Sequence, residues 1–206
     1  MKAADLSSPV ILASTSPFRR ELLGRLGLPF EAVAPDYVEG EVAGLAPRDL
    51  AARHAAGKAR SVARLFPGRV VIGSDQVAEL DGRALGKPED AAAAVAQLTA
   101  MAGRRVLFHT GLALVRDARE ELTVETFAVV LRRLPLRALR SYVEREQPLG
   151  CAGSFRIEGL GIALMEALEG RDYTALIGLP LIALTSLLAR FGVDVLPGLP
   201  RAQERR

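Results

Sequence analysis

Short apolar runs and amphipathic segments alternate along the first half of the chain. Runs of consecutive apolar residues have the length of a buried strand, and apolar positions three and four residues apart mark one face of a helix. This alternation predicts strands at about 9–13, 30–35 and 69–75, and helices at about 17–26, 47–66 and 89–103. Ser16 suits the N-cap of the first helix and Pro17 its first turn.

Long strand patterns and turns replace this alternation in the second half. Asp81-Gly82 is a strong hairpin signal. The pattern predicts strands at 104–117 and 121–134, helices at 135–146 and 179–191, and a glycine-rich segment at 150–161. Alternation followed by hairpins predicts an α/β fold with a mixed sheet. Since the chain shows no internal repeat or long linker, we expect one domain over residues 1–196 and a basic, disordered tail at 197–206.

The charge and the aromatic content argue against nucleic-acid binding. The formal net charge is +3, and the tail, with three arginines against Glu204, supplies +2 of it, so the body carries about +1. A nearly neutral body with 5% aromatic residues provides neither a basic field nor stacking platforms for nucleic acid.

The cysteine content and the apolar stretches indicate a cytoplasmic protein. Cys151 is the single cysteine, which excludes an internal disulfide and fits a reducing compartment. The apolar run at 9–13 has strand length and lacks the features of a secretory signal. The apolar stretch 175–193 contains Pro180 and Arg190, so we interpret it as a core helix and expect no membrane span.

Familiar catalytic motifs are absent, and the candidate chemistry lies at the ends of predicted elements. The sequence has no GxxxxGK[ST] loop and no GxSxG turn, and its two histidines are isolated. Ser14, Ser16 and Arg19 surround the first strand–helix turn, which suits either a phosphate site or a plain helix cap. Asp75 ends a predicted strand, which suits either a ligand-binding edge or a turn.

Two lysines and an acidic loop add further candidates. The chain has 24 arginines and three lysines, of which Lys58 and Lys87 are internal. Such a bias suggests that these two positions need a compact ammonium charge. Glu39 lies in an acidic loop that suits either a hard cation or exposure to solvent.

Four motifs occur in order within residues 10–192: LASTSPFRRELL, GSDQVAELDGRALGKP, CAGSFRIEGLG and GLPLIAL. Together they resemble the Maf-like nucleoside triphosphate pyrophosphatases, and their variants are similar to the branch that acts on 7-methyl-GTP. The resemblance implies an elongated, mixed and twisted sheet flanked by helices, with an active-site cleft between two lobes. It also implies hydrolysis between the α- and β-phosphates with a divalent cation, Mg²⁺ or Mn²⁺.

The resemblance implies a role for each candidate residue. Asp75 is the expected proton acceptor and, with Glu39, a metal ligand. Phosphate binding is expected from Ser14, Ser16, Arg19, Lys58 and Lys87.

The substrate-selecting positions of this branch correspond to Phe18, Gln76 and Glu158. A 7-methylated guanine is a cation, so Phe18 is expected to stack on it. Glu158 is expected to accept its N1–H and amine hydrogens, and Gln76 to donate to O6. The chain departs from its relatives by Phe18, where tryptophan is common, and by Val38, where aspartate is common.

Alternative functions remain open from the sequence. The same chemistry on dTTP, UTP or another non-standard nucleotide is the nearest alternative, and a regulator of septum formation with little turnover is another. The partners we expect are a nucleotide substrate and a second copy of the chain in a homodimer.

Overall fold

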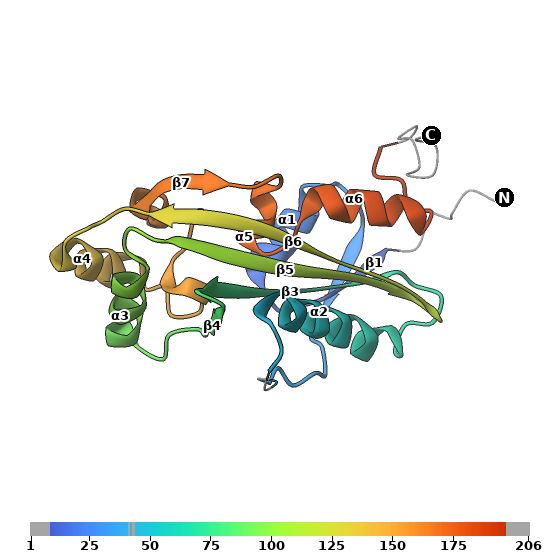
Figure 1. The fold of residues 1–206 in the computed structure, drawn as a ribbon. Helices are drawn as coiled ribbons and strands as arrows, with labels where there is room; N and C mark the ends of the chain where they lie inside the picture. Colours follow the sequence, from blue (N-terminus) through green and yellow to red (C-terminus); the bar gives the residue numbers. More distant parts are fainter. Residues whose placement is uncertain (1–8, 41, 43, 197–206) are drawn as a thin grey trace, which may run out of the picture.

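The structure is a computed structural model that describes residues 9–40, 42 and 44–196 (Figure 1). A seven-stranded sheet forms its elongated spine in the order β2-β1-β3-β5-β6-β7, with β4 paired to β3 outside this path. The strands are β1 (Val10–Ala13), β2 (Phe30–Val33), β3 (Val71–Leu80), β4 (Arg83–Leu85), β5 (Arg105–Arg116), β6 (Arg119–Leu131) and β7 (Met165–Glu169). The helices are α1 (Pro17–Gly24), α2 (Pro47–Ala63), α3 (Ala91–Met101), α4 (Leu136–Glu146), α5 (Tyr173–Ile177) and α6 (Leu181–Arg190), with 3₁₀ turns η1 (Ala152–Ser154) and η2 (Leu160–Leu164). The expected tail at 197–206 lies outside the described residues.

The sheet is mixed, which confirms the predicted fold class. β1 runs parallel to β2 and to β3. The pairs β3–β4, β3–β5, β5–β6 and β6–β7 are antiparallel. Parallel neighbours need a crossover connection, and α1 and α2 supply it in the first half of the chain.

The hydrophobic core divides between the two ends of the sheet, which form the two expected lobes. Alternate residues of β1, β3 and β5 face opposite sides of the sheet. At one end, α2 covers one face while α1 and α6 cover the other. At the other end, α3, α4 and the 3₁₀ turns pack around Phe108 and Phe127. Figure 1 shows α2 in front of the sheet near one end and α3 and α4 at the opposite end.

Two glycines allow α2 to lie directly on the sheet. A Cβ atom on Gly73 of β3 would lie 2.3 Å from the Ala55 carbonyl oxygen, and one on Gly111 of β5 would lie 2.3 Å from that of Ala51. Any side chain at either position would therefore push the helix away. The close approach matters for the site, because α2 carries Lys58 and β3 carries Asp75.

Asp75 does not end its strand, which corrects the sequence analysis. β3 continues to Leu80 and turns into β4 through Asp81-Gly82, so Asp75 lies near the middle of the strand. The neighbouring strand β1 stops at Ala13, opposite Gly73, and β4 begins its pairing opposite Ala78. Between these two neighbours, one edge of β3 is uncovered, and both Asp75 and Gln76 line the cavity that opens there.

Other differences from the prediction concern the C-terminal part. The sequence analysis assigned no strand at β7, because Met, Glu, Ala and Leu favour helices, but pairing with β6 overrides that preference. The apolar stretch 175–193 is broken at Gly178–Pro180 into α5 and α6. Within the described ranges, every helix is too short or too polar to cross a membrane.

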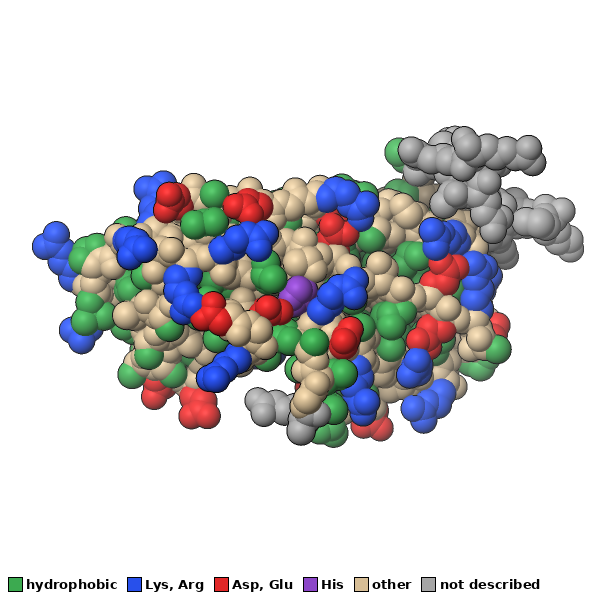
Figure 2. Space-filling view, in the orientation of Figure 1, with side chains coloured by type: hydrophobic (Ala, Val, Ile, Leu, Met, Phe, Trp, Pro, Cys, Tyr) green, Lys and Arg blue, Asp and Glu red, His purple; other side chains and the backbone are tan. Residues whose placement is uncertain are grey.

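Charged side chains of both signs are mixed on the face shown in Figure 2. Arginine–carboxylate pairs such as Arg60–Glu120 and Arg105–Glu169 occur among the charged side chains of the described residues. The distribution agrees with the small net charge of the chain.

Candidate active site

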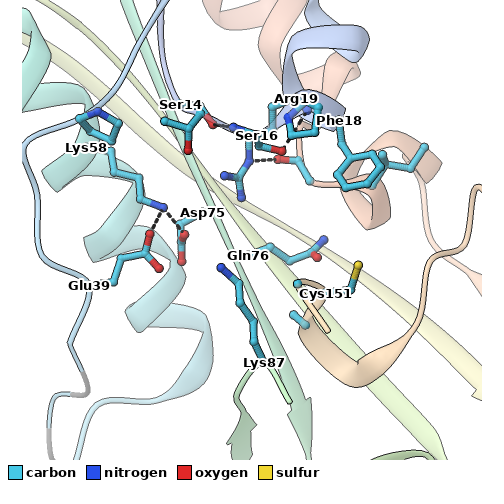
Figure 3. Close-up of a pocket in the computed structure, with 17 residues that line it drawn as sticks. Ser14, Ser16, Phe18, Arg19, Glu39, Lys58, Asp75, Gln76, Lys87 and Cys151 are labelled. Carbon is cyan, nitrogen blue, oxygen red and sulfur yellow. Dashed lines mark hydrogen bonds and ion pairs between the residues drawn. The ribbon is translucent and has the colours of Figure 1, made fainter. Parts of the chain in front are cut away.

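A cavity of about 440 Å³ opens at the uncovered edge of β3, between the β1–α1 turn, α2 and the segment after β4. Three cationic side chains, Arg19, Lys58 and Lys87, line it together with the carboxylates of Glu39 and Asp75. Figure 3 shows Arg19 and Lys87 directed into the same space from opposite sides. The structure thus brings together residues that are up to 164 positions apart, from Ser14 to Gly178.

The β1–α1 turn is built by its own hydroxyl groups. Ser14 Oγ accepts the Ser16 backbone N–H at 3.1 Å, and Ser16 Oγ accepts the Arg19 N–H at 3.4 Å. Ser16 is therefore the N-cap of α1, as predicted. In both bonds the hydroxyl oxygen is the acceptor, so each hydroxyl hydrogen is left to donate to an anion in the cavity. The observed cap is therefore compatible with the anion site expected at this turn.

Arg19 is held at the cavity wall by the main chain of the α5–α6 connection. Its Nε donates to the Gly178 carbonyl oxygen at 2.9 Å, and the Ser74 hydroxyl lies 2.9 Å from the same oxygen. Burial lowers the pKa of Arg19 from its ordinary value, and the charges of Asp75 and Glu39 oppose this shift. Since an arginine pKa lies so far above neutrality, the guanidinium stays charged. The remaining N–H groups of this fixed fork can bind phosphate oxygens.

Lys58 connects the two carboxylates of the cavity. Its Nζ lies 2.6 Å from Asp75 Oδ1 and 2.5 Å from Glu39 Oε1. The Lys58 and Asp75 side chains are 7% and 9% exposed, whereas that of Glu39 is 46% exposed at the cavity mouth. The cluster is therefore a buried ion pair with a third charge at the solvent side.

Glu39 is ionised at neutral pH. Desolvation raises its pKa, but the hydrogen bond and the charge of Lys58, with Lys87 and His54, outweigh that effect and leave the pKa below its ordinary value. Carboxylate oxygens of Glu39 and Asp75 converge on one cation, which is the arrangement that a hard divalent ion also requires. No group of three or more His, Cys, Asp or Glu ligands occurs in the described part of the chain.

A smaller hollow of about 50 Å³ adjoins the cavity and collects the expected selectivity residues. Phe18, Gln76 and Glu158 all line it, and Phe18 and Gln76 also line the larger cavity. Glu158 is exposed and lies between the 3₁₀ turns η1 and η2. The larger cavity thus holds the three cationic side chains, and the adjoining hollow adds Glu158 to the ring of Phe18 and the amide of Gln76, which the two hollows share.

Gln76 is anchored by its amide nitrogen. Nε2 donates to the carbonyl oxygens of Ala175 and Leu176 at 2.8 and 3.0 Å, and lies 3.2 Å from the Thr110 hydroxyl. The sequence analysis expected Gln76 to donate to a base oxygen. Because the donor group is already engaged, the role left to Gln76 is acceptance at Oε1.

The ring of Phe18 already receives a cation. The Arg156 guanidinium carbon lies 5.6 Å from the ring centroid, within the range of a cation–π contact. This contact was not expected from the sequence, where the two residues are 138 positions apart. Phe18 is therefore not a core residue of α1; its ring lines the smaller hollow and contacts Arg156 there.

The remaining candidates serve structure. Cys151 lines both hollows, and burial raises the pKa of its thiol, with Glu158 adding to the shift. A protonated thiol is a poor nucleophile. His109 is buried and bonds to Thr126 and Glu79 through its two ring nitrogens. Val38 is 89% exposed, and its apolar side chain offers no ligand to a metal.

Comparison with known proteins agrees with this arrangement. A family model described as Maf-like protein matches residues 9–191. A Syntrophotalea carbinolica protein named 7-methyl-GTP pyrophosphatase is 51% identical over 190 residues, which cover 91% of this chain and 96% of that protein. A protein of the same name from Xanthomonas oryzae pv. oryzae is 52% identical, and the match covers 89% of this chain and 96% of that protein. Another from Pseudomonas aeruginosa is 49% identical, and the match covers 90% of this chain and 98% of that protein. The chain therefore belongs to the Maf-like protein family.

Proposed function

We propose that the protein is a nucleoside triphosphate pyrophosphatase that hydrolyses 7-methyl-GTP to 7-methyl-GMP and pyrophosphate, and so removes a modified nucleotide from the pool. The observation that carries the proposal is the pair of adjoining hollows. The larger one offers three cations to a triphosphate chain, and the smaller one offers Phe18, Gln76 and Glu158 to a base. The names of the relatives support the same substrate.

The residues of the larger cavity suit hydrolysis of the α–β phosphoanhydride bond. Asp75 accepts the proton of the attacking water while the bond to the departing pyrophosphate breaks. Lys58 keeps the Asp75 carboxylate in place at 2.6 Å. Arg19 and Lys87 face the same space and neutralise charge that builds up on the leaving group.

A divalent cation, Mg²⁺ or Mn²⁺, fits the donor set of the site. Glu39 and Asp75 would hold it, and because Mg²⁺ keeps several waters and binds substrate phosphates, two protein carboxylates are sufficient. When bound, such an ion supplies positive charge to the phosphate oxygens and lowers the pKa of water.

The nearest alternatives differ in substrate or in turnover. Pyrimidine triphosphates such as dTTP and UTP carry no positive charge on the base and gain little from Phe18 and Glu158. A regulatory protein that binds nucleotides without turnover has no need of a carboxylate and a lysine buried together beside the phosphates.

A nucleotide panel tests the proposal. We expect pyrophosphate release in the presence of Mg²⁺ to be fastest with 7-methyl-GTP, and slower with GTP, which lacks the N7-methyl group and has a neutral base. Faster hydrolysis of dTTP or UTP would show that pyrimidine triphosphates are the preferred substrates. Binding without pyrophosphate release from any nucleotide would support the regulatory alternative. The expected homodimer is tested on the same sample by light scattering.

The cations of the cavity are expected to act on the transition state. Lys87→Ala and Arg19→Ala should each lower kcat/KM by at least about tenfold, equivalent to about 1.4 kcal/mol of transition-state stabilisation. Arg19→Ala also removes the hydrogen bond to Gly178 and should lower the melting temperature. Lys87→Ala should leave the melting temperature unchanged, because Lys87 is exposed. If kcat/KM were unchanged in both variants, Arg19 and Lys87 would not form a phosphate-binding site.

Glu158 is expected to select the cationic base. Glu158→Gln keeps the shape of the side chain but removes its negative charge. The glutamine amide also places N–H donors opposite the N1–H and amine donors of the guanine. Charge-assisted hydrogen bonds are about twice as strong as neutral ones. Because Glu158 is exposed, we expect kcat/KM for 7-methyl-GTP to fall by about tenfold, near the lower limit for a hydrogen bond to a charged group.

The matched measurement is the same variant with UTP, for which the fall should be clearly smaller. An equal loss on both nucleotides would mean that Glu158 serves the fold or the common chemistry, and the substrate assignment would lose its physical basis.

A further inference from the structure

The segment 34–40, which carries Glu39, docks on one face of α2 through two side chains. Tyr37 and Glu39 are two residues apart, and both side chains contact the helix. Their partners are His54, Gly57 and Lys58, which are spaced as i, i+3 and i+4 and therefore share one helix face. Glu39 reaches Lys58 at the cavity, and Tyr37 reaches His54 and Gly57 beside it.

The contact between Tyr37 and His54 is a hydrogen bond combined with ring packing. The Tyr37 hydroxyl oxygen lies 2.9 Å from His54 Nδ1. The two rings meet edge to face, with centroids 5.7 Å apart and an interplanar angle of 68°. His54 is buried at 5% exposure, so its ring is a fixed partner for the more exposed segment.

Gly57 makes room for the Tyr37 ring. A Cβ atom at Gly57 would lie 2.1, 2.5 and 2.7 Å from three carbons of that ring, which are its three nearest neighbours. Glycine inside a helix is less favourable than alanine, because it loses more backbone freedom on folding. The space that it leaves for Tyr37 is a physical reason for its presence at this point of α2.

We propose that Tyr37 is a positioning residue, which holds the segment 34–40 on α2 so that the Glu39 carboxylate meets Lys58 at the mouth of the cavity. Glu39 is 46% exposed and has Lys58 as its ion-pair partner, so Tyr37 supplies the second point that fixes its direction. Two attachment points two residues apart leave the intervening backbone little freedom, whereas one salt bridge at a partly exposed site contributes little order.

The role of Glu39 in catalysis rests on the proposed pyrophosphatase function, but its attachment through Tyr37 does not. The first measurement is therefore the NMR backbone order parameters of residues 37–40 without nucleotide, which report the amplitude of backbone motion. Gly57→Ala should displace the ring and lower the order parameters in this segment, while those in the interior of α2 stay high because alanine favours the helix. Unchanged order parameters of residues 37–40 would overturn the proposal, whatever the activity of the protein.

The second measurement is a set of double-mutant cycles. We expect Gly57→Ala to lower kcat/KM by about tenfold, less than the hundredfold that a 1 Å displacement of a catalytic group can cost. Tyr37→Phe, which keeps the ring and loses the hydroxyl, should lie between Gly57→Ala and the wild type. In a Tyr37→Ala background, Gly57→Ala should have less than about a twofold effect, because no ring remains to be displaced.

A further cycle separates positioning from a general structural role. In a Glu39→Gln background, the effect of Gly57→Ala should also fall below about twofold, because the carboxylate that Tyr37 positions is gone. An undiminished tenfold effect in that background would overturn the proposal, as would wild-type kcat/KM in Gly57→Ala. If the wild-type protein hydrolyses no nucleotide, the proposed function fails, and the order parameters of residues 37–40 alone decide the attachment.

Discussion

Asp75→Asn is expected to lower kcat by about a thousandfold while nucleotide binding largely survives. A positioned general base contributes roughly 10²- to 10⁴-fold. Asparagine keeps the size of the side chain but accepts no proton from water. The Asp75 side chain is 9% exposed and lies 2.6 Å from the Lys58 ammonium, so its carboxylate is held at a fixed point of the cavity wall. Lys58 retains Glu39 as a charged partner in the variant.

Single-turnover kinetics and the affinity for an analogue with a methylene group in the α–β bridge separate the two effects. Glu79→Gln is a matched control, because Glu79 lies on the same strand and the same face but bonds to His109 instead of lining the cavity. The control should keep kcat within about twofold, as expected for a residue outside the reaction. Near-normal kcat in Asp75→Asn would mean that Asp75 is not the base.

Lys58→Met is expected to lower both activity and stability. The ammonium joins two carboxylates, and its removal leaves Asp75 buried without its ion-pair partner. Breaking a buried pair costs 3–5 kcal/mol, and we expect about 3 kcal/mol, because the half-exposed Glu39 can turn to water. kcat/KM should fall by about a hundredfold, since a phosphate-binding cation and the group that orients the base are lost together.

The free energy of unfolding in urea measures the stability part, and its pH dependence identifies the cause. In the wild type, Lys58 helps to lower the pKa of Glu39 below its ordinary value of 4.5. A lowered folded-state pKa adds stability that is present above the unfolded pKa and is lost as pH falls through the folded pKa. The difference in unfolding free energy between the wild type and Lys58→Met should therefore become smaller as pH falls below about 4.5.

Lys87→Met is the matched control for stability. Lys87 lines the same cavity, but it is exposed and none of the ion pairs found among the described residues includes it. Its replacement should leave the unfolding free energy within about 0.5 kcal/mol of the wild type. An equally stable Lys58→Met variant would show that the buried cluster contributes nothing to the fold.

The types and order of most elements follow from local patterns. β1, α1, α2, α3, β5, β6 and α4 lie where the sequence predicts them, and their observed ends differ by small shifts that are common at element boundaries. Ser16 caps α1 because the interaction spans three residues and needs no tertiary partner. The sequence pattern did not predict the elements within the glycine-rich segment, because the turns η1 and η2 depend on packing against other parts of the chain.

The candidate site residues were predicted from sequence motifs, whereas their positions and hydrogen-bond partners became known only from contacts in the structure. Asp75 was expected at a strand end, but it lies mid-strand at an edge that β1 and β4 leave uncovered. The binding of Gln76 Nε2 to α5 redirects the expected role of that residue from donor to acceptor. These features depend on strand register and on segments about a hundred residues away, which a single sequence does not encode in any local period.

The sequence by itself determined the fold class, the mixed sheet and the group of side chains that carries the charge of the site, because hydrophobic period, caps and ordered motifs are local properties. Only the tertiary structure decided that Lys58 joins Asp75 to Glu39, that Phe18 receives Arg156, and that Tyr37 rests on Gly57. Each of these contacts joins separate elements, and two of them need α2 at a definite height above the sheet. That height is set by Gly73 and Gly111, where the absence of a side chain lets the helix backbone approach the strands.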